Sequence, residues 1–282
     1  MAIQWQDRRL TLPDGQFIHA MHGTYIPKEG RPCDEGKPTL VFLHEALGHI
    51  RMWKQFPERL AELTGCDVLV YERLGYGESS PITLPRADDY LVPEGERRVA
   101  EVLDAAGIGS VILVGHSDGG TIALIAAASL GKRVKAIITE AAHLYADELT
   151  LKGIREAVKA YKTTDLPQRL ARYHGERTDL LFRAWSETWL RESCHQNMNF
   201  SAWLAAIHCP ALILQGSDDQ YGVPEQVEDI CMGIGKNATA RFLEGCGHVP
   251  HLEAPDQTLK VMAQFIEQAD VTSSTLVNTP GL

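Results

Sequence analysis

The sequence lacks the features that direct a chain to a membrane or to a nucleic acid. No apolar run reaches the roughly 18 residues that a transmembrane helix needs, and the N-terminus has no basic segment followed by an apolar one. Basic residues are scarce, because 27 lysines and arginines face 37 aspartates and glutamates, a net charge of −10. A surface with this charge repels phosphate backbones and anionic lipids. We therefore expect a cytoplasmic protein without a membrane or nucleic-acid partner.

Nucleotide and metal motifs are absent as well. Neither G-x-G-x-x-G nor a P-loop pattern occurs, and the six cysteines form no C-x-x-C pair. The segment from His44 to His49 is superficially similar to the zinc motif H-E-x-x-H, but its histidines are five positions apart. On a helix, five residues turn about 500°, which leaves the two rings about 140° apart rather than on one face. The sequence therefore predicts no metal and no bound cofactor.

Short apolar runs alternate with stretches of helical spacing along most of the chain. The runs predict buried strands at 39–43, 68–71, 111–114 and 211–214, with weaker ones at 134–139 and 240–243. Helices are expected at 52–63, 88–106, 121–130, 224–234 and 255–268, and a hairpin around the Pro-Asp-Gly turn at 13–15. This alternation predicts an α/β fold with a doubly wound, mostly parallel sheet and helices on both faces.

Residues 143–207 interrupt this rhythm, because they contain helical stretches but no convincing strand. We interpret them as a helical cap inserted into a core formed by 1–142 and 208–270, with 271–282 as a C-terminal tail. Three of the five tryptophans, Trp185, Trp189 and Trp203, lie in this cap. They either hold the insertion together or line a substrate pocket.

The most informative motif is Gly115-His116-Ser117-Asp118-Gly119, which lies between a predicted strand and a predicted helix. A serine on such a tight turn is lifted away from the sheet, and the glycines on either side let the backbone bend. The amides at the start of the following helix point toward developing negative charge, so the amide of Asp118 is a candidate oxyanion donor. The motif therefore predicts Ser117 as a nucleophile.

Over about residues 10–268 the chain resembles the α/β-hydrolase superfamily, in which the nucleophile is followed by an acid and then a histidine. The resemblance implies Asp219 as the acid and His248 as the base, since each follows a predicted strand. Asp218 is adjacent and competes for the acid role, but the family pattern favours Asp219. By position, Ala46 supplies the second oxyanion amide, although Glu45 replaces the glycine that most relatives have before it.

Three features narrow the resemblance: Ser117-Asp-Gly-Gly, the helical insertion beginning near Gly153-Ile-Arg155, and the strand Cys209-Pro-Ala-Leu-Ile-Leu. With them the chain looks most like the valacyclovir hydrolase or biphenyl-hydrolase-like branch of the superfamily. The resemblance implies a serine hydrolase that cleaves a small-molecule carboxylic ester through an acyl-serine intermediate. Glu101, 16 residues before Ser117, resembles the acid that holds a substrate ammonium in this branch, but a surface role on a polar helix is the alternative. Two other functions stay open: a carbon–carbon bond hydrolase of ring-cleavage products, and a small-ligand receptor on the same fold.

Overall fold

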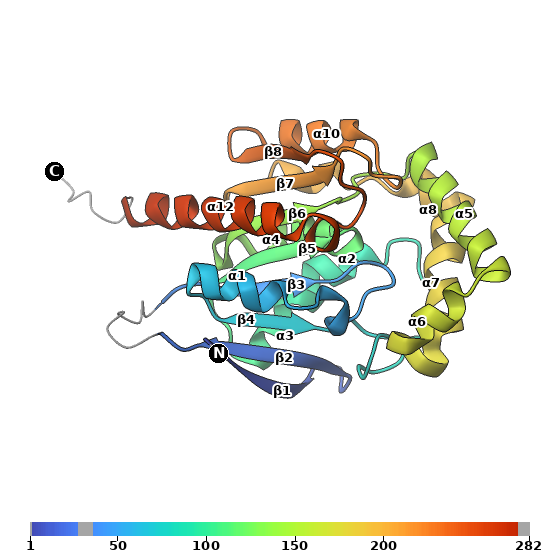
Figure 1. Cartoon of the computed structure of the whole chain (residues 1–282), viewed down its shortest axis with the longest axis horizontal. Coiled ribbons are helices and arrows are strands. Elements are labelled where there is room, and N and C mark those ends of the chain that lie inside the picture. Colours follow the sequence, from blue (N-terminus) through green and yellow to red (C-terminus); the bar gives the residue numbers. More distant parts are fainter. Residues whose placement is uncertain (1, 28–35, 276–282) are drawn as a thin grey trace.

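The computed structural model describes residues 2–27 and 36–275, and its core is one eight-stranded sheet (Figure 1). The strand order is β1-β2-β4-β3-β5-β6-β7-β8, with strands β3 to β8 mutually parallel where they pair. The strands are β1 (Ile3–Thr11), β2 (Phe17–Tyr25), β3 (Thr39–Leu43), β4 (Val68–Tyr71), β5 (Val111–His116), β6 (Val134–Glu140), β7 (Ala211–Gly216) and β8 (Ala238–Leu243). The predicted α/β fold with a mostly parallel sheet is confirmed.

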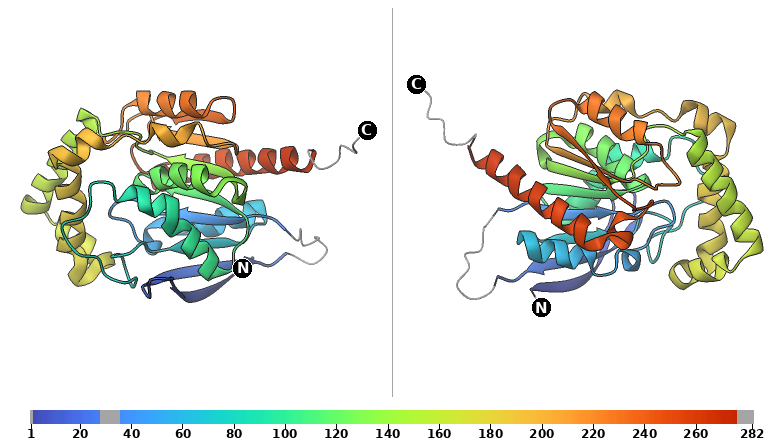
Figure 2. Two further views of the ribbon diagram at one scale, coloured as in Figure 1. Left: turned by 180° about the vertical axis from the view of Figure 1, so that it is seen from behind. Right: turned by 45° about the horizontal axis from the view of Figure 1, so that its top comes forward.

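Helices cover both faces of this sheet, as the two views in Figure 2 show. One apolar cluster joins Leu40 and Phe42 of β3 to α1 (Phe56–Thr64) and α12 (Pro255–Thr275). A second cluster joins Val41 and Leu43 of the same strand to α3 (Val99–Ala106), α4 (Asp118–Leu130) and α10 (Pro224–Ile234). Because successive side chains point to opposite faces, a strand covered on both sides must be apolar throughout.

The N-terminal hairpin is longer than expected. Its two strands pair antiparallel from Ile3 with Tyr25 to Thr11 with Phe17, and β2 pairs antiparallel with β4. Most side chains of β1 are exposed or half-buried. Ile3 and Trp5 alternate with glutamines, but the polar run Asp7-Arg8-Arg9 interrupts this alternation before the predicted part of the hairpin.

The helices on the core differ from the predicted ranges mainly at their ends. The segment expected as one helix at 88–106 contains α2 (Leu91–Pro93), a π-helical turn at Glu94–Arg98 and then α3. Pro93 supplies no N–H to the helical ladder at this point. The predicted tail is wrong at its start, since α12 continues to Thr275, while residues 276–282 lie outside the described part. Shorter helical turns are η1 (Ile50–Trp53), η3 (Gly131–Arg133), η4 (Gly175–Arg177) and α11 (Pro250–Glu253).

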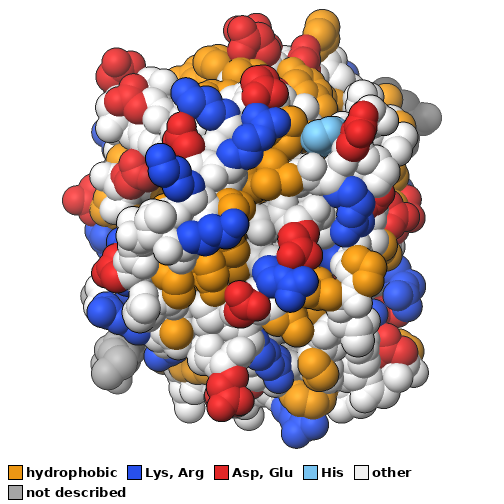
Figure 3. Space-filling model, turned by 90° about the vertical axis from the view of Figure 1, so that its right-hand side faces the viewer, with side chains coloured by type: hydrophobic (Ala, Val, Ile, Leu, Met, Phe, Trp, Pro, Cys, Tyr) orange, Lys and Arg blue, Asp and Glu red, His pale blue; other side chains and the backbone are white. Residues whose placement is uncertain are grey.

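A layer of helices covers one end of the sheet, between β6 and β7 in the chain (Figure 1). These are α5 (Glu148–Thr163), α6 (Leu166–His174), α7 (Thr178–Trp189) and α8 (Glu192–Asn197). The next helix, α9 (Ser201–Leu204), contacts α4 and α10 of the core. The outward face of this layer carries interspersed acidic and basic side chains with apolar patches between them (Figure 3). In the described part of the chain, none of the helices has the length and apolar character to cross a membrane.

Candidate active site

Ser117 lies on a strained turn between β5 and α4. Its φ of 53° falls in the left-handed region, which residues other than glycine rarely adopt. A Cβ at Gly115 would lie 2.1 Å from the carbonyl oxygen of Gly119, and a Cβ at Gly119 would lie 1.9 Å from the carbonyl oxygen of Leu43. Only glycine fits at these two positions, which explains the spacing of the motif in physical terms.

An acid and a base from two neighbouring strand ends meet beside this turn. Asp219 follows β7 and His248 follows β8, and Oδ1 of Asp219 lies 2.8 Å from Nδ1 of His248. The backbone N–H of Tyr221 donates to the same oxygen at 2.8 Å. Asp218 is exposed and its carboxylate accepts a hydrogen bond from the Ser217 hydroxyl. The structure therefore brings Asp219, and not Asp218, to the histidine.

The environment of Asp219 favours its charged form. Burial acts to raise the pKa of this carboxyl, but the hydrogen bond and the charge of His248 lower it by more, with a further contribution from the Tyr221 amide. A carboxylate in this position holds the Nδ1–H tautomer of the imidazole and leaves Nε2 free to accept a proton.

The peptide between Glu45 and Ala46 is fixed by its carbonyl oxygen. That oxygen accepts from the His44 ring at 2.7 Å, from the Arg73 guanidinium at 2.8 Å and from the Gly48 amide at 3.0 Å. In a trans peptide the N–H points away from the C=O, so the Ala46 amide is directed away from this cluster. Within the described residues, the backbone N–H groups of Ala46 and Asp118 have no hydrogen-bond acceptor. Both residues line the cavity next to Ser117.

The protonation state of His44 supports this arrangement. Its Nε2 accepts from the backbone N–H of Arg73 at 3.0 Å, so its Nδ1 carries the proton that is donated to Glu45. Burial and the nearby Arg73 charge lower the pKa of His44 to about 3, and the ring is therefore neutral.

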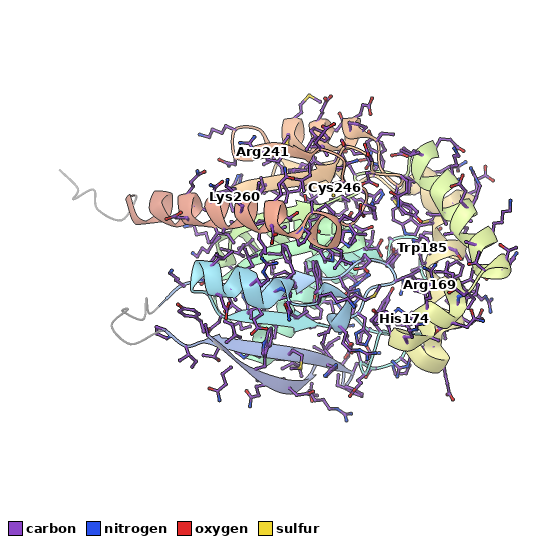
Figure 4. All side chains as sticks on the ribbon, viewed as in Figure 1. Arg169, His174, Trp185, Arg241, Cys246 and Lys260 are labelled. Atoms are coloured by element: carbon purple, nitrogen blue, oxygen red, sulfur yellow. The ribbon has the colours of Figure 1, made fainter. Side chains whose placement is uncertain are left out.

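Ser117, His248 and the two residues with the candidate amides, Ala46 and Asp118, line one cavity of about 140 Å³ between the sheet and the cap. Figure 4 shows Trp185 at this junction. The cavity is lined by Glu45, Ala46, Leu47, Ser117, Asp118, His143, Thr150, Ile154, Trp185, Trp189, Tyr221 and His248. Apolar and aromatic side chains from the cap therefore face the candidate nucleophile, and Trp185 and Trp189 belong to this lining. Trp203 instead donates to Glu96 on the core.

The side chain of Asp118 links the nucleophile turn to the cap. The Tyr90 hydroxyl donates to its Oδ2 at 2.6 Å, and the Trp189 indole N–H donates to the Tyr90 oxygen at 2.9 Å. The Arg73 guanidinium lies 3.4 Å from the same carboxylate oxygen. This buried chain was not predicted, because Trp189 and Tyr90 are 99 residues apart and no local motif signals their contact.

Glu101 does not line the cavity. Its carboxylate is held at 2.8 Å by Arg98 and at 3.2 Å by Arg97 on the same helical segment. Two arginines therefore pair with this carboxylate, and the residue lies apart from the other predicted site residues.

The sequence also predicts no metal site. Residues 2–27 and 36–275 contain no group of three His, Cys, Asp or Glu side chains placed to hold a metal ion.

Comparisons with known proteins identify the family of this chain. Lipase 1 of Psychrobacter immobilis is 28% identical and is matched over 89% of this chain and 81% of its own length. The proline iminopeptidase of Lactobacillus delbrueckii subsp. bulgaricus is 24% identical over 88% of this chain and 95% of its own. The human serine hydrolase BPHL is 27% identical over 71% and 69% of the two chains.

A solved structure shows the same fold. The 2-hydroxy-6-oxo-6-phenylhexa-2,4-dienoate hydrolase of Rhodococcus sp. strain RHA1 superposes with a TM-score of 0.70 at 15% identity, over 94% of this chain and 99% of that one. The model of the alpha/beta hydrolase family matches residues 40–261, which is more than half of the sequence. On this match, the chain belongs to the α/β-hydrolase family.

Proposed function

We propose that the protein is a serine hydrolase that cleaves small carboxylic esters through an acyl-serine intermediate. The observation that carries this proposal is the convergence of Ser117, the His248–Asp219 pair and two unengaged amides on one cavity. Acyl transfer needs a nucleophile, a base that takes its proton and donors for the oxyanion, and these residues supply all three.

In the proposed reaction, Nε2 of His248 removes the proton of the Ser117 hydroxyl as the oxygen attacks the ester carbonyl carbon. The amides of Ala46 and Asp118 donate to the resulting oxyanion. The imidazolium then protonates the departing alkoxide, which leaves as the alcohol while the acyl group remains on Ser117. Water, deprotonated by the same imidazole, attacks the acyl-serine. The imidazolium then returns this proton to the Ser117 oxygen as the carboxylic acid leaves, which restores the free serine and the neutral imidazole.

The cavity favours a short and largely apolar acyl group. Its volume of about 140 Å³ lies below the range of roughly 300–1,000 Å³ that is usual for pockets that hold drug-sized ligands. Leu47, Ile154, Trp185 and Trp189 form apolar walls, and such walls stabilise alkyl groups by burial. The lipase among the relatives also supports the choice of esters as the substrate class.

A substrate panel tests this proposal. It compares p-nitrophenyl esters of two, four, eight and sixteen carbons, an amino-acid ester, an L-prolyl amide and a vinylogous diketone, each with the wild type and with Ser117→Ala. We expect the highest kcat/KM on the two- or four-carbon ester and loss of this activity in the variant. Cleavage of the diketone alone would assign carbon–carbon bond hydrolysis, and cleavage of the prolyl amide alone would assign a peptidase. Saturable binding without turnover would assign a receptor.

A further inference from the structure

A buried histidine connects the three loops that meet at the candidate site. His116, the last residue of β5, is 1% exposed and directly precedes Ser117. Its Nε2 lies 2.8 Å from the backbone carbonyl oxygen of His248, and its Nδ1 lies 3.4 Å from Oε2 of Glu45. Glu45 belongs to the loop after β3 that carries Ala46. One side chain thus touches the oxyanion loop, the nucleophile turn and the base loop.

The neighbours of His116 determine its charge. A carbonyl oxygen only accepts, so Nε2 must carry a proton. A carboxylate at the other ring nitrogen also accepts, and a neutral ring would direct its lone pair at this negative charge. Two acceptors therefore favour the imidazolium. Burial lowers the pKa of His116, but the hydrogen bond and the charge of Glu45 raise it by more, to about 9.

Other titratable groups around the ring are already engaged. Glu140 at the end of β6 accepts from His251 of α11 at 2.6 Å, and the rings of His248 and His251 both lie 5.1 Å from the ring of His116. Glu45 is 3.4 Å away and has no other basic side chain within ion-pair distance in the described chain. Glu45 is therefore the carboxylate that pairs with His116, and the charge of the nearby Glu140 also raises the His116 pKa.

Gly48 makes room for this carboxylate. A Cβ at position 48 would lie 2.6 Å from Oε2 of Glu45, so a larger residue there would displace the side chain. Residue 45 is consequently held twice: its carbonyl oxygen accepts from three donors, and its carboxylate pairs with His116. The Ala46 amide that follows it is fixed by both contacts.

We propose that the Glu45–His116 ion pair is a positioning device that holds the Ala46 loop and the His248 loop in register around Ser117. This inference rests on the proposed function, since it assigns these loops an oxyanion donor and a base. Neither side chain has a role of its own in the proposed reaction. The His116 ring contacts the backbone carbonyl of His248, and the Glu45 carboxylate contacts the nucleophile turn only through the His116 ring.

The test uses Glu45→Gln and His116→Gln in the full chain. Glu45→Gln has nearly the same shape, removes the charge and changes a side chain that is 21% exposed, so the fold should survive. We expect kcat on a short-chain ester to fall about ten- to a hundredfold with KM within about twofold, because misplacing reacting groups by 1 Å can cost a hundredfold. The rate at which a fluorophosphonate labels Ser117 should fall in parallel.

The pH profile separates positioning by the ion pair from a simple packing role. Wild-type kcat should decline as the pH rises through about 9, where His116 loses its proton. In Glu45→Gln this decline should move to lower pH, because the carboxylate that raises the His116 pKa is gone. In His116→Gln the decline should disappear.

The control is His19→Gln. His19 also pairs with a buried carboxylate, at 2.9 Å from Glu72, but it lies on β2, away from the cavity lining. Its kcat should stay within about twofold of wild type, as expected of a change remote from the reacting groups. Wild-type kcat and an unmoved alkaline limb in Glu45→Gln would overturn the inference. Full activity in Ser117→Ala, or no labelling of Ser117 in the wild type, would instead remove the proposed function itself.

Discussion

Gly119→Ala is a one-carbon change with a large expected effect. The added Cβ would lie 1.9 Å from the carbonyl oxygen of Leu43, whereas ordinary contacts begin at 3.4 Å. The end of β3 and the start of α4 must therefore separate by about 3.4 − 1.9 = 1.5 Å. Both partners are backbone, so no side-chain rotation can relieve the contact.

This separation would pull apart the two candidate oxyanion donors, since Ala46 follows β3 and Asp118 begins α4. Losing one such donor typically costs about 10²–10³ in kcat. Overpacking should also cost about 1–3 kcal/mol of unfolding free energy, which lowers Tm by about 2–4 °C for each kcal/mol in domains of 150–250 residues.

The assay measures kcat on a short-chain ester and Tm by circular dichroism. Gly109→Ala is the matched control, because a Cβ there meets nothing within 4 Å and its φ is not in the left-handed region. It should retain wild-type kcat and Tm. If Gly119→Ala behaved like this control, the close approach of β3 and α4, and with it the geometry of the oxyanion donors, would be refuted.

Three further predictions concern the acid, the buried charge and metals. Asp219→Asn should lower kcat by about 10⁴ while Asp218→Asn stays near wild type, and equal losses would contradict the assignment of the acid. The free energy of unfolding, measured in urea, should decrease between pH 6.5 and 9, because folding raises the His116 pKa to about 9 and this stabilisation is lost as the proton leaves; His116→Gln should lack that decrease. EDTA should leave activity unchanged, since the described residues offer no metal-ligand cluster; loss restored by zinc would show otherwise.

The strands were predictable to within a few residues because burial on both faces leaves a local signal in the sequence. The expected ranges at 39–43 and 68–71 match β3 and β4. The start of β1 and the end of α12 have no such signal. The chain around Thr272–Thr275 is rich in Ser and Thr, which favour turns, yet α12 continues through it. Its preceding turns pack Leu259, Met262 and Ile266 into the core, and adding residues to a formed helix is favourable.

The candidate site likewise has a part that local motifs predict and a part that depends on contacts between distant residues. Ser117, Asp219 and His248 each follow a predicted strand within a short recognisable motif, so sequence alone could identify them. Contacts across the chain could not be predicted: Glu45 and His116 are 71 residues apart, and His116 and His248 are 132 apart.

Glu101 shows why spacing along the chain is a weak guide to function. Its distance from Ser117 in sequence says nothing about which side of the helix it occupies. The structure places it between Arg97 and Arg98. The apolar walls contributed by α5 and α7 likewise depend on how the cap docks onto the sheet, which no local pattern specifies.

The most direct test of the central claim is covalent labelling by a fluorophosphonate, followed by peptide mapping. Such a reagent reacts with a serine that is activated by a neighbouring base and oxyanion donors. The geometry predicts one adduct, on the Ser117 hydroxyl, formed together with the loss of hydrolase activity and absent from Ser117→Ala. An adduct on another residue, or full activity in Ser117→Ala, would contradict the assignment of Ser117 as the nucleophile.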